Sequence, residues 1–325
     1  MRNSKSLHVI LIYVGGDFLR IHPYIIITAA MLFFSGNFIV GKALQGTIPP
    51  FTLALFRFLS AALFLLPFCY KTVMLNHSLW KKEWKPLLGL SITGIVLFNG
   101  CLYLAVNFTS SINAAIVDAL TPAVAAILGF LFLKETLTKV QTFGIILSFG
   151  GIIWIITQGS IETLLSLAFN IGDIIMLIGI VFWALYSIII KQHSHKFPNT
   201  AGLVMTMIIG VIFLFPIAII EWMTVGLPKL TSWKALLGII YIGVFPSSLA
   251  LLAWYRGVRE VGPAKASIFF NLVPVFTTIL SILFLNETFT YHQLFGGVFV
   301  LFGVYLSTRI PKHLRVKIKR VKKAS

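Results

Sequence analysis

Asp118-Ala-Leu-Thr-Pro122 opens the stretch that decides the fold, and this stretch runs on to Leu-Phe-Leu-Lys-Glu135-Thr-Leu-Thr. It is apolar enough to cross a bilayer, yet it contains an acid and a proline. It recurs 152 positions later, where Leu-Val-Pro274 runs on to Leu-Phe-Leu-Asn-Glu287-Thr-Phe-Thr. Proline and glutamate are 13 positions apart in both copies. The first prediction is therefore a membrane segment that occurs twice.

The composition is that of a membrane protein. Of the 325 residues, 58% are hydrophobic and 11% are charged, whereas about 25% of a soluble domain is charged. Apolar runs of roughly 20 residues recur along the chain, and they are continuous rather than alternating. Backbone groups in lipid must pair within their own segment or in a closed barrel, so continuous runs favour helices. We predict an all-α integral membrane protein.

Ten transmembrane helices with short connections are expected. Membrane proteins carry an excess of lysine and arginine on the cytoplasmic side. If both termini are cytoplasmic, 22 of the 26 basic residues fall on that side and 3 fall outside. The predicted helices are 24–43, 51–70, 86–106, 111–134, 139–158, 172–191, 201–222, 235–255, 264–285 and 291–308.

The repeat divides the chain into two inverted halves. Each half holds five predicted helices, and five is odd, so the second copy enters the membrane from the opposite side. Inverted repeats of this kind place a substrate site at their interface near the midplane. The expected division is 1–22 cytoplasmic extension, 23–158 first five-helix repeat, 172–308 second five-helix repeat, and 309–325 basic cytoplasmic tail. The first 22 residues resemble a signal peptide without a good cleavage site.

The net charge of +17 does not indicate nucleic-acid binding. Eight basic residues lie between Arg309 and Lys323, directly after the last apolar run, which is typical of a tail that faces anionic lipid. No aromatic-basic motif or soluble module accompanies the charge. Because phosphate loops, serine elbows and zinc motifs are also missing from the sequence, we expect no enzyme activity, no cofactor and no bound metal.

One polar layer is predicted within the first half. Arg57 and Asp118 are the deepest ionisable residues, and a lone charge at such depth costs at least about 2.5–3.5 kcal/mol, so it usually faces the bundle interior. Asn37 and Asn99 fall at similar depth, with Tyr103 somewhat further outward. Two interpretations are open: a buried Arg57–Asp118 pair that fixes helix packing, or a site for substrate or protons.

The second half does not repeat these charges, because Asp118 aligns with Phe270. Its candidates are polar or aromatic, and each could instead be a core-packing residue. A cavity that is charged on one side and aromatic on the other would suit a small amphipathic or zwitterionic solute. The candidates from this half are Trp183, Tyr186, Tyr255 and Asn271.

The repeated proline and glutamate have structural interpretations as well. Pro122 and Pro274 lie near the centres of the predicted helices, lack an N–H, and are expected to kink them as hinges. Glu135 and Glu287 are expected to hydrogen-bond the free amides of the next helix, with proton coupling as the alternative. Thr-x-x-Gln capping boxes follow both glutamates.

The chain resembles the EamA-type permeases of the drug/metabolite transporter superfamily over residues 24–308. The resemblance is carried by the two Pro…Glu segments, by Phe56-Arg57-Phe58, by Tyr103-Leu-Ala105 and by Ala114-Ala115. It implies a carrier in the bacterial cytoplasmic (inner) membrane, often an exporter of amino acids, other metabolites or toxic compounds. Such carriers work by alternating access without a cofactor. In this family the position of Asp118 is commonly uncharged.

Two functional hypotheses follow. The first is a secondary active transporter, an exporter by the resemblance, of a small organic metabolite or drug-like solute, with a proton or another ion as coupling partner. The second is a membrane-embedded lipid-handling or scaffolding protein in which Arg57 and Asp118 form a purely structural pair. Either protein could be a monomer or a homodimer.

Overall fold

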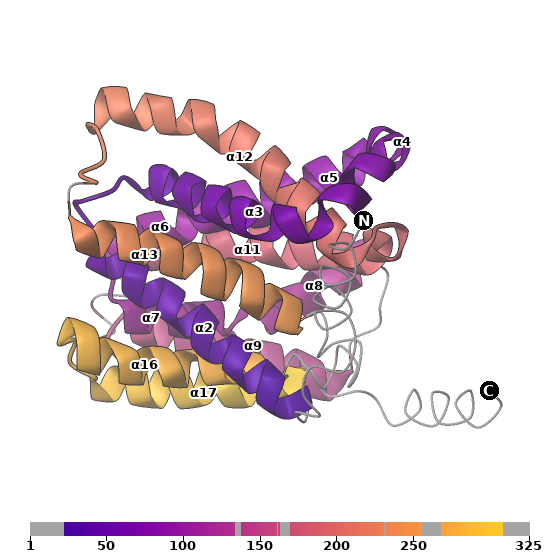
Figure 1. The fold of residues 1–325 in the computed structure, drawn as a ribbon. Coiled ribbons are helices and arrows are strands. Elements are labelled where there is room, and N and C mark those ends of the chain that lie inside the picture. The colour runs from indigo at the N-terminus through magenta and orange to yellow at the C-terminus, as the bar shows by residue number, and fades with distance from the viewer. Residues whose placement is uncertain are drawn as a thin grey trace.

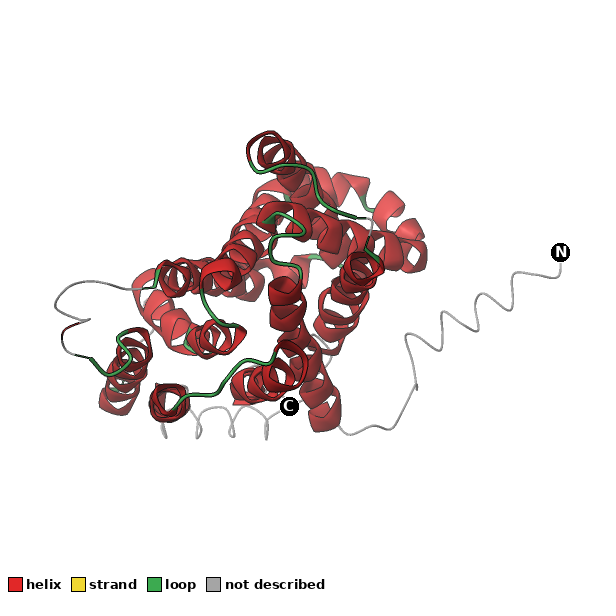
Figure 2. Ribbon diagram, turned by 90° about the vertical axis from the view of Figure 1, so that its left-hand side faces the viewer, coloured by secondary structure: helices red, strands yellow, loops and turns green. Residues whose placement is uncertain are grey.

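The computed structural model describes residues 23–133, 138–160, 162, 170–230, 232–254 and 268–307. Within these residues all regular structure is helical, and most helices run side by side along one axis (Figures 1 and 2). The predicted all-helical class is therefore confirmed for the described chain. The predicted extension 1–22 and tail 309–325 lie outside the described residues.

The helices are numbered in chain order. The first half holds α2 (Pro23–Ala43), α3 (Pro50–Leu75), α4 (His77–Lys82), α5 (Trp84–Leu90), η1 (Ser91–Leu97), α6 (Phe98–Phe108), α7 (Ser111–Asp118), α8 (Thr121–Leu133) and α9 (Lys139–Ile156). The second half holds α11 (Ile171–His193), η2 (Ser194–Lys196), α12 (Asn199–Thr224), α13 (Trp233–Val244), η3 (Phe245–Leu249), η4 (Ile268–Asn271), α16 (Leu272–Leu285) and α17 (Tyr291–Ser307). Of these, η1 and η3 are π-helical, and η2 and η4 are 3₁₀ turns.

The described residues contain seven helices that are long and apolar enough to cross a membrane. Three shorter apolar helices accompany them, at Lys139–Ile155, Phe269–Leu285 and Tyr291–Leu306. Many large side chains on the outside of the bundle are apolar and exposed, such as Leu63, Ile212 and Phe284. An apolar exterior of this extent suits contact with lipid rather than with water.

The membrane span predicted over 111–134 is interrupted within its length. α7 ends at Asp118 and α8 begins at Thr121, with a two-residue turn between them. Pro122 therefore lies in the first turn of α8, where helices leave N–H groups unpaired and a missing N–H is tolerated. The irregularity predicted at Pro122 is thus a two-residue break just before the proline, within the span Ser111–Leu131. Pro274 likewise lies in the first turn of α16, directly after η4.

Small residues bring α9 and α17 into close contact. A Cβ atom on Gly151 would lie 2.7 Å from the carbonyl oxygen of Gly296, which is too close for any side chain. The Ser148 hydroxyl also donates to the carbonyl of Val300, at 3.3 Å. The small-residue faces of both helices are thus used for packing within the chain. Other extensive pairs join α3 with α12, α6 with α11, and α2 with α16.

Candidate functional site

Arg57 lies at the centre of a buried polar cluster between the two halves of the chain. Its side chain projects from α3 and is 5% exposed. Its Nε donates to Ser247 Oγ from η3, and its Nη1 donates to Asn99 Oδ1 at 2.7 Å and to Tyr103 Oη at 3.2 Å, both from α6. The guanidinium carbon also lies 5.0 Å from the centre of the Phe58 ring. We call Arg57, Asn37, Asn99, Tyr103 and Ser247 the arginine centre.

A proline explains how Ser247 reaches Arg57. The carbonyl of Ile242 would normally accept from the N–H four residues later, but that residue is Pro246, which has none. The Ser247 hydroxyl donates to this free carbonyl instead, at 2.8 Å. Its oxygen lone pairs then remain for the Nε–H of Arg57. The π-helical turn η3 therefore presents Ser247 to the guanidinium as an acceptor.

A second π-helical turn, η1, orients Asn99 so that its side-chain oxygen also faces Arg57. The Asn99 side-chain amide donates through Nδ2 to the carbonyls of Gly94, at 2.7 Å, and Ile95, at 3.2 Å. These two bonds fix which way the amide points, so that Oδ1 is left facing Arg57. Isolated π turns are frequent at functional sites. Here η3 supplies Ser247 to Arg57, and η1 supplies the carbonyls that orient Asn99, which follows it in α6.

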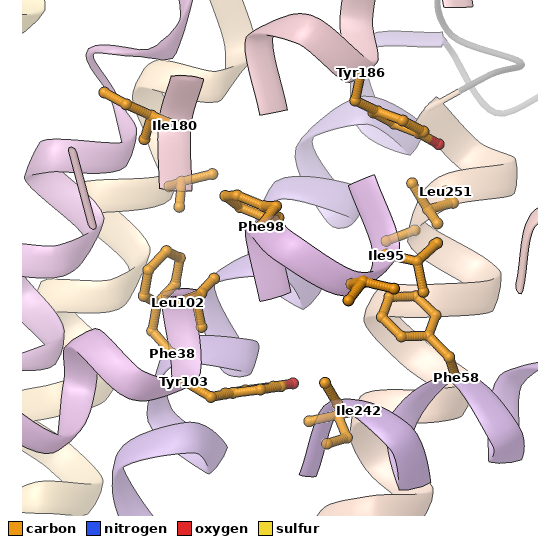
Figure 3. Close-up of a cluster of buried hydrophobic side chains, with 14 of the residues drawn as sticks. Phe38, Phe58, Ile95, Phe98, Leu102, Tyr103, Ile180, Tyr186, Ile242 and Leu251 are labelled. Atoms are coloured by element: carbon orange, nitrogen blue, oxygen red, sulfur yellow. The ribbon is translucent and has the colours of Figure 1, made fainter. Parts of the chain in front are cut away.

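Tyr103 completes the arginine centre through Asn37. Its hydroxyl donates to Asn37 Oδ1 at 2.6 Å, so its oxygen is free to accept from Arg57. Tyr103 is 2% exposed, and its hydroxyl points across the bundle toward Ile242 in Figure 3. Every group that contacts the guanidinium is neutral. The positive charge of Arg57 is solvated by dipoles but is not neutralised by a carboxylate within the described residues.

Asp118 does not take part in this cluster. Its Oδ1 accepts from the hydroxyl of Thr121 at 3.3 Å, at the break between α7 and α8. No salt bridge joins Asp118 to Arg57 in the described part of the chain. The structure thus brings Asn37, Arg57, Asn99 and Tyr103 together as expected, and it leaves Asp118 apart. The purely structural Arg57–Asp118 pair has no contact to support it.

Two aromatic candidates of the second half lie next to the arginine centre. Trp183 on α11 packs against Phe98, with ring centres 4.6 Å apart, and Phe98 directly precedes Asn99. Tyr186 packs against Trp183 and lies over Gly94, where any side chain would collide with its ring. Figure 3 shows Phe98 near the middle of a cluster of buried hydrophobic side chains, with Tyr186 at the upper right. Both residues therefore contact the η1–α6 segment that carries Asn99.

The remaining candidates fall into two groups. Tyr255 and Glu135 lie outside the described residues. Asn271 ends η4, and its buried Oδ1 has no hydrogen-bond partner. Thr277 Oγ1 and Ser281 Oγ on α16 are also buried and unpartnered. Unpartnered buried polar atoms therefore occur at the start of α16 and along it.

Glu287 binds a different helix from the one predicted. Its carboxylate accepts from the backbone N–H groups of Ser111, at 3.0 Å, and Ile112, at 3.3 Å, and so caps the start of α7. The expected bond to the next helix is not needed, because Thr290 and Gln293 cap α17 themselves. Since α7 belongs to the first half and Glu287 to the second, this cap joins the two halves at one end of the bundle.

Further polar contacts close the same end. Lys42 Nζ donates to the carbonyls of Val106, at 2.9 Å, and Thr109, at 3.0 Å. Thr109 Oγ1 in turn donates to the buried carboxylate of Asp173, at 2.6 Å. Gln293 Nε2 donates to Asn113 Oδ1 at 2.7 Å. We call Lys42, Thr109, Asp173, Glu287 and Gln293 the end network.

Comparison with known proteins gives the family. The profile of the EamA-like transporter family matches the chain twice, over residues 22–157 and 170–309. The chain belongs to the EamA-like transporter family. It is 33% identical over 299 residues to the uncharacterized transporter YyaM of Bacillus subtilis, which covers 90% of this chain and 97% of YyaM. The predicted resemblance is confirmed.

Other relatives of this EamA-like transporter carry similar names. An uncharacterized transporter of Archaeoglobus fulgidus is 27% identical, covering 88% of this chain and 96% of the relative. The uncharacterized inner membrane transporter YedA of Escherichia coli is 28% identical, covering 80% and 82%. One solved crystal structure superposes with a TM-score of 0.59 at 15% identity, covering 88% of this chain and 96% of the other, which shows a shared fold. The chain is therefore a multi-pass membrane protein of a transporter family.

Proposed function

We propose that this chain is a secondary active transporter that exports a small organic solute with an anionic group across the cytoplasmic membrane. The arginine centre carries the proposal. A buried cation without a counter-ion is costly, and a solute carboxylate or similar anion would neutralise it. Arg57 Nη2 and Asn37 Nδ2 take no acceptor among the described residues, so both can donate to such a group. An anionic solute would therefore complete the hydrogen bonding of the centre.

The adjoining residues suggest the rest of the solute. Trp183 and Tyr186 offer aromatic surface beside Asn99, which suits an apolar side group. Asp118 and Asn271 each lie at a helix break before a proline, and broken helices typically form the ion and substrate sites of carriers. In this proposal Asp118 holds an amine of the solute or a coupling proton. A zwitterionic or amphipathic metabolite fits all these groups together.

We further propose ten transmembrane helices in two inverted repeats, 23–158 and 172–308. The family profile matches twice, and the two π turns, η1 and η3, occupy corresponding positions of the two halves. The main helix pairs α9–α17 and α3–α12 are those expected when corresponding helices meet across a two-fold axis. The charge distribution supports cytoplasmic termini. In that orientation the end network lies on the outer side, and the breaks before Pro122 and Pro274 serve as hinges for alternating access.

The first test is a ligand screen by thermal shift. A ligand that binds only the folded protein raises its melting temperature, by an amount that grows with concentration over Kd. We expect zwitterionic amino acids or other carboxylates to raise the melting temperature, and cationic drugs without an anionic group to leave it unchanged. Stabilisation by cationic drugs alone would contradict the assignment of Arg57.

The second test is transport in proteoliposomes with the solute that the screen identifies. We expect Arg57→Ala and Asp118→Asn each to abolish transport while membrane insertion persists. Lys71→Ala is the matched control, because Lys71 is an exposed cation at the other end of the same helix, α3. Normal transport by both site variants would show that the site lies elsewhere.

A further inference from the structure

A pocket lies at the end of the bundle opposite the end network. It is an open pocket of about 580 Å³ between the α4–α5 corner and the end of α11. Figure 1 shows α4 and α5 at the far end of the bundle from the α12–α13 connection. Lys82, Lys85, Lys196 and His193 supply its polar wall, and Gly89 and Ile189 supply its apolar wall. The arginine centre contributes none of its lining residues.

The charge of this pocket is positive and only partly neutralised. Glu83 is its one lining acid, and it accepts from Lys196 Nζ at 2.8 Å. The hydrogen bond from Lys196 lowers the pKa of Glu83, so the carboxyl stays ionised and remains paired with Lys196. Lys82 and Lys85 form no salt bridge within the described residues. His193 Nδ1 is buried there without any hydrogen-bond partner.

The apolar wall continues in the direction of the membrane interior. Trp84 is 53% exposed at the mouth of the pocket, as expected for an aromatic residue at a membrane–water interface. Gly89 lies five residues further along this helical segment, about 7 Å deeper at 1.5 Å per residue. Because Gly89 has no side chain, the space beside Ile189 stays open; a Cβ there would lie 3.1 Å from Ile189 Cδ1. The pocket is thus cationic at its mouth and apolar at its depth.

We propose that this pocket binds the headgroup phosphate of an anionic phospholipid. Lys82 and Lys85, which are exposed at the pocket, would receive the phosphate, and an acyl chain would descend past Gly89 and Ile189. Basic pockets between membrane helices are known to take phosphate headgroups. The proposal needs only that this end lies at the membrane surface, and it does not depend on transport or on the solute.

The test measures lipid binding to the full-length, delipidated protein by native mass spectrometry. Phosphatidylglycerol is compared with phosphatidylcholine of identical acyl chains. We expect the wild type to bind phosphatidylglycerol with roughly tenfold preference, because each lysine near an anionic headgroup adds a favourable electrostatic contribution to the binding free energy. The Lys82→Gln/Lys85→Gln double variant should lose this preference.

A matched control separates the pocket from general attraction to anionic lipid. The Lys71→Gln/Lys81→Gln double variant removes two exposed lysines from α3 and α4, outside the pocket. It should keep the preference of the wild type. Equal loss in both double variants would overturn the proposal, and so would a preference that survives in Lys82→Gln/Lys85→Gln.

Two further measurements distinguish the source of the phosphate and the role of the apolar wall. If millimolar inorganic phosphate displaces the lipid, the pocket is a free-phosphate site and the lipid proposal fails. Gly89→Val fills the space beside Ile189 without changing any charge. It should weaken the binding of both lipids several-fold, and unchanged binding would contradict the predicted path of the acyl chain.

Discussion

At the scale of single residues, the arginine centre is an arrangement of neutral acceptors around one cation. Ser247 donates to Ile242, Asn99 donates to Gly94, and Tyr103 donates to Asn37. Each donation uses up a hydrogen and leaves an oxygen for the guanidinium. The centre therefore holds Arg57 in one position while preserving its charge for an incoming anion.

Ser247 and Ser248 make this idea testable with a neighbouring pair. Both are fully buried in η3, and Ser248 Oγ donates only to the carbonyl of Gly243, at 3.0 Å. We expect Ser247→Ala to weaken solute binding about tenfold or more, since a hydrogen bond to a charged group contributes about 1.5–3 kcal/mol. Ser248→Ala should leave the affinity within about twofold. Titrations that give equal losses for the two variants would assign Ser247 a merely structural role.

At the scale of elements, irregular helices position the functional groups. The π turns η1 and η3 and the break between α7 and α8 all occur within segments that hydropathy alone predicts as continuous helices. Each irregularity leaves backbone carbonyls or amides without their usual partner, and polar side chains fill some of these places. Regular helices would have offered no such places for Ser247 or Asn99.

Pro246 provides the prediction at this scale. Pro246→Ala restores an N–H to the carbonyl of Ile242 and so favours a regular α-helix through η3. We expect the melting temperature to stay level or rise, because proline inside a helix costs about 3 kcal/mol. Solute affinity should fall, because Ser247 loses the carbonyl that orients it. Thermal unfolding and titration of the same sample measure both effects.

A second internal proline serves as the control. Pro216 lies inside α12, outside the arginine centre. Pro216→Ala should raise the melting temperature without lowering solute affinity. If Pro246→Ala behaved in the same way, η3 would have no special part in solute binding.

The all-helical class could be predicted from the sequence, since continuous apolar runs favour helices, and counts of residues along a helix predicted a polar layer. Sequence reasoning placed Asn37, Arg57 and Asn99 at one level. Arg57 and Asn99 are hydrogen-bonded to each other, and Asn37 is joined to Arg57 through Tyr103.

Sequence reasoning missed Ser247, because a π turn changes which face a residue occupies, and periodicity of 3.6 assumes no such turn. A sequence signal for Ser247 does exist, because Pro246-Ser-Ser interrupts an apolar run. Pro246 removes the N–H that would bond the carbonyl of Ile242, four residues earlier. Sequence reasoning also paired Arg57 with Asp118 as one alternative, because depth alone says nothing about direction around the bundle.

At the scale of the whole molecule, the two halves are joined by caps that reach across them. Glu287 of the second half caps α7 of the first, and Glu221 of α12 accepts from the N–H groups of Phe51 and Thr52 at the start of α3. Carboxylates at helix starts also interact favourably with the helix dipole. Both caps are therefore hydrogen-bonded contacts between the two halves.

Glu287→Gln tests whether the end network governs opening. Removing the charge weakens the cap by about 0.3–2 kcal/mol, and we expect faster hydrogen–deuterium exchange in the peptide that contains Ser111 and Ile112. We also expect a several-fold shift toward the state that is open at this end. Glu221→Gln is the comparison, and it should affect only the peptide that contains Phe51 and Thr52. Unchanged exchange at Ser111 and Ile112 would contradict a gating role for Glu287.

The π turn η3 also has a geometric consequence for the helix that contains it. An extra residue within a helix turns everything beyond it by about 100°, the angle that one residue spans when 3.6 residues complete a turn. Before η3, Gly243 on α13 packs tightly against Ser60 on α3. After it, Trp254 packs against Phe270, with ring centres 4.7 Å apart. Deleting a single residue from η3 would rotate the rest of the helix about its axis and turn the later side chains away from their present neighbours. A deletion in η3 should therefore be more harmful than a substitution there.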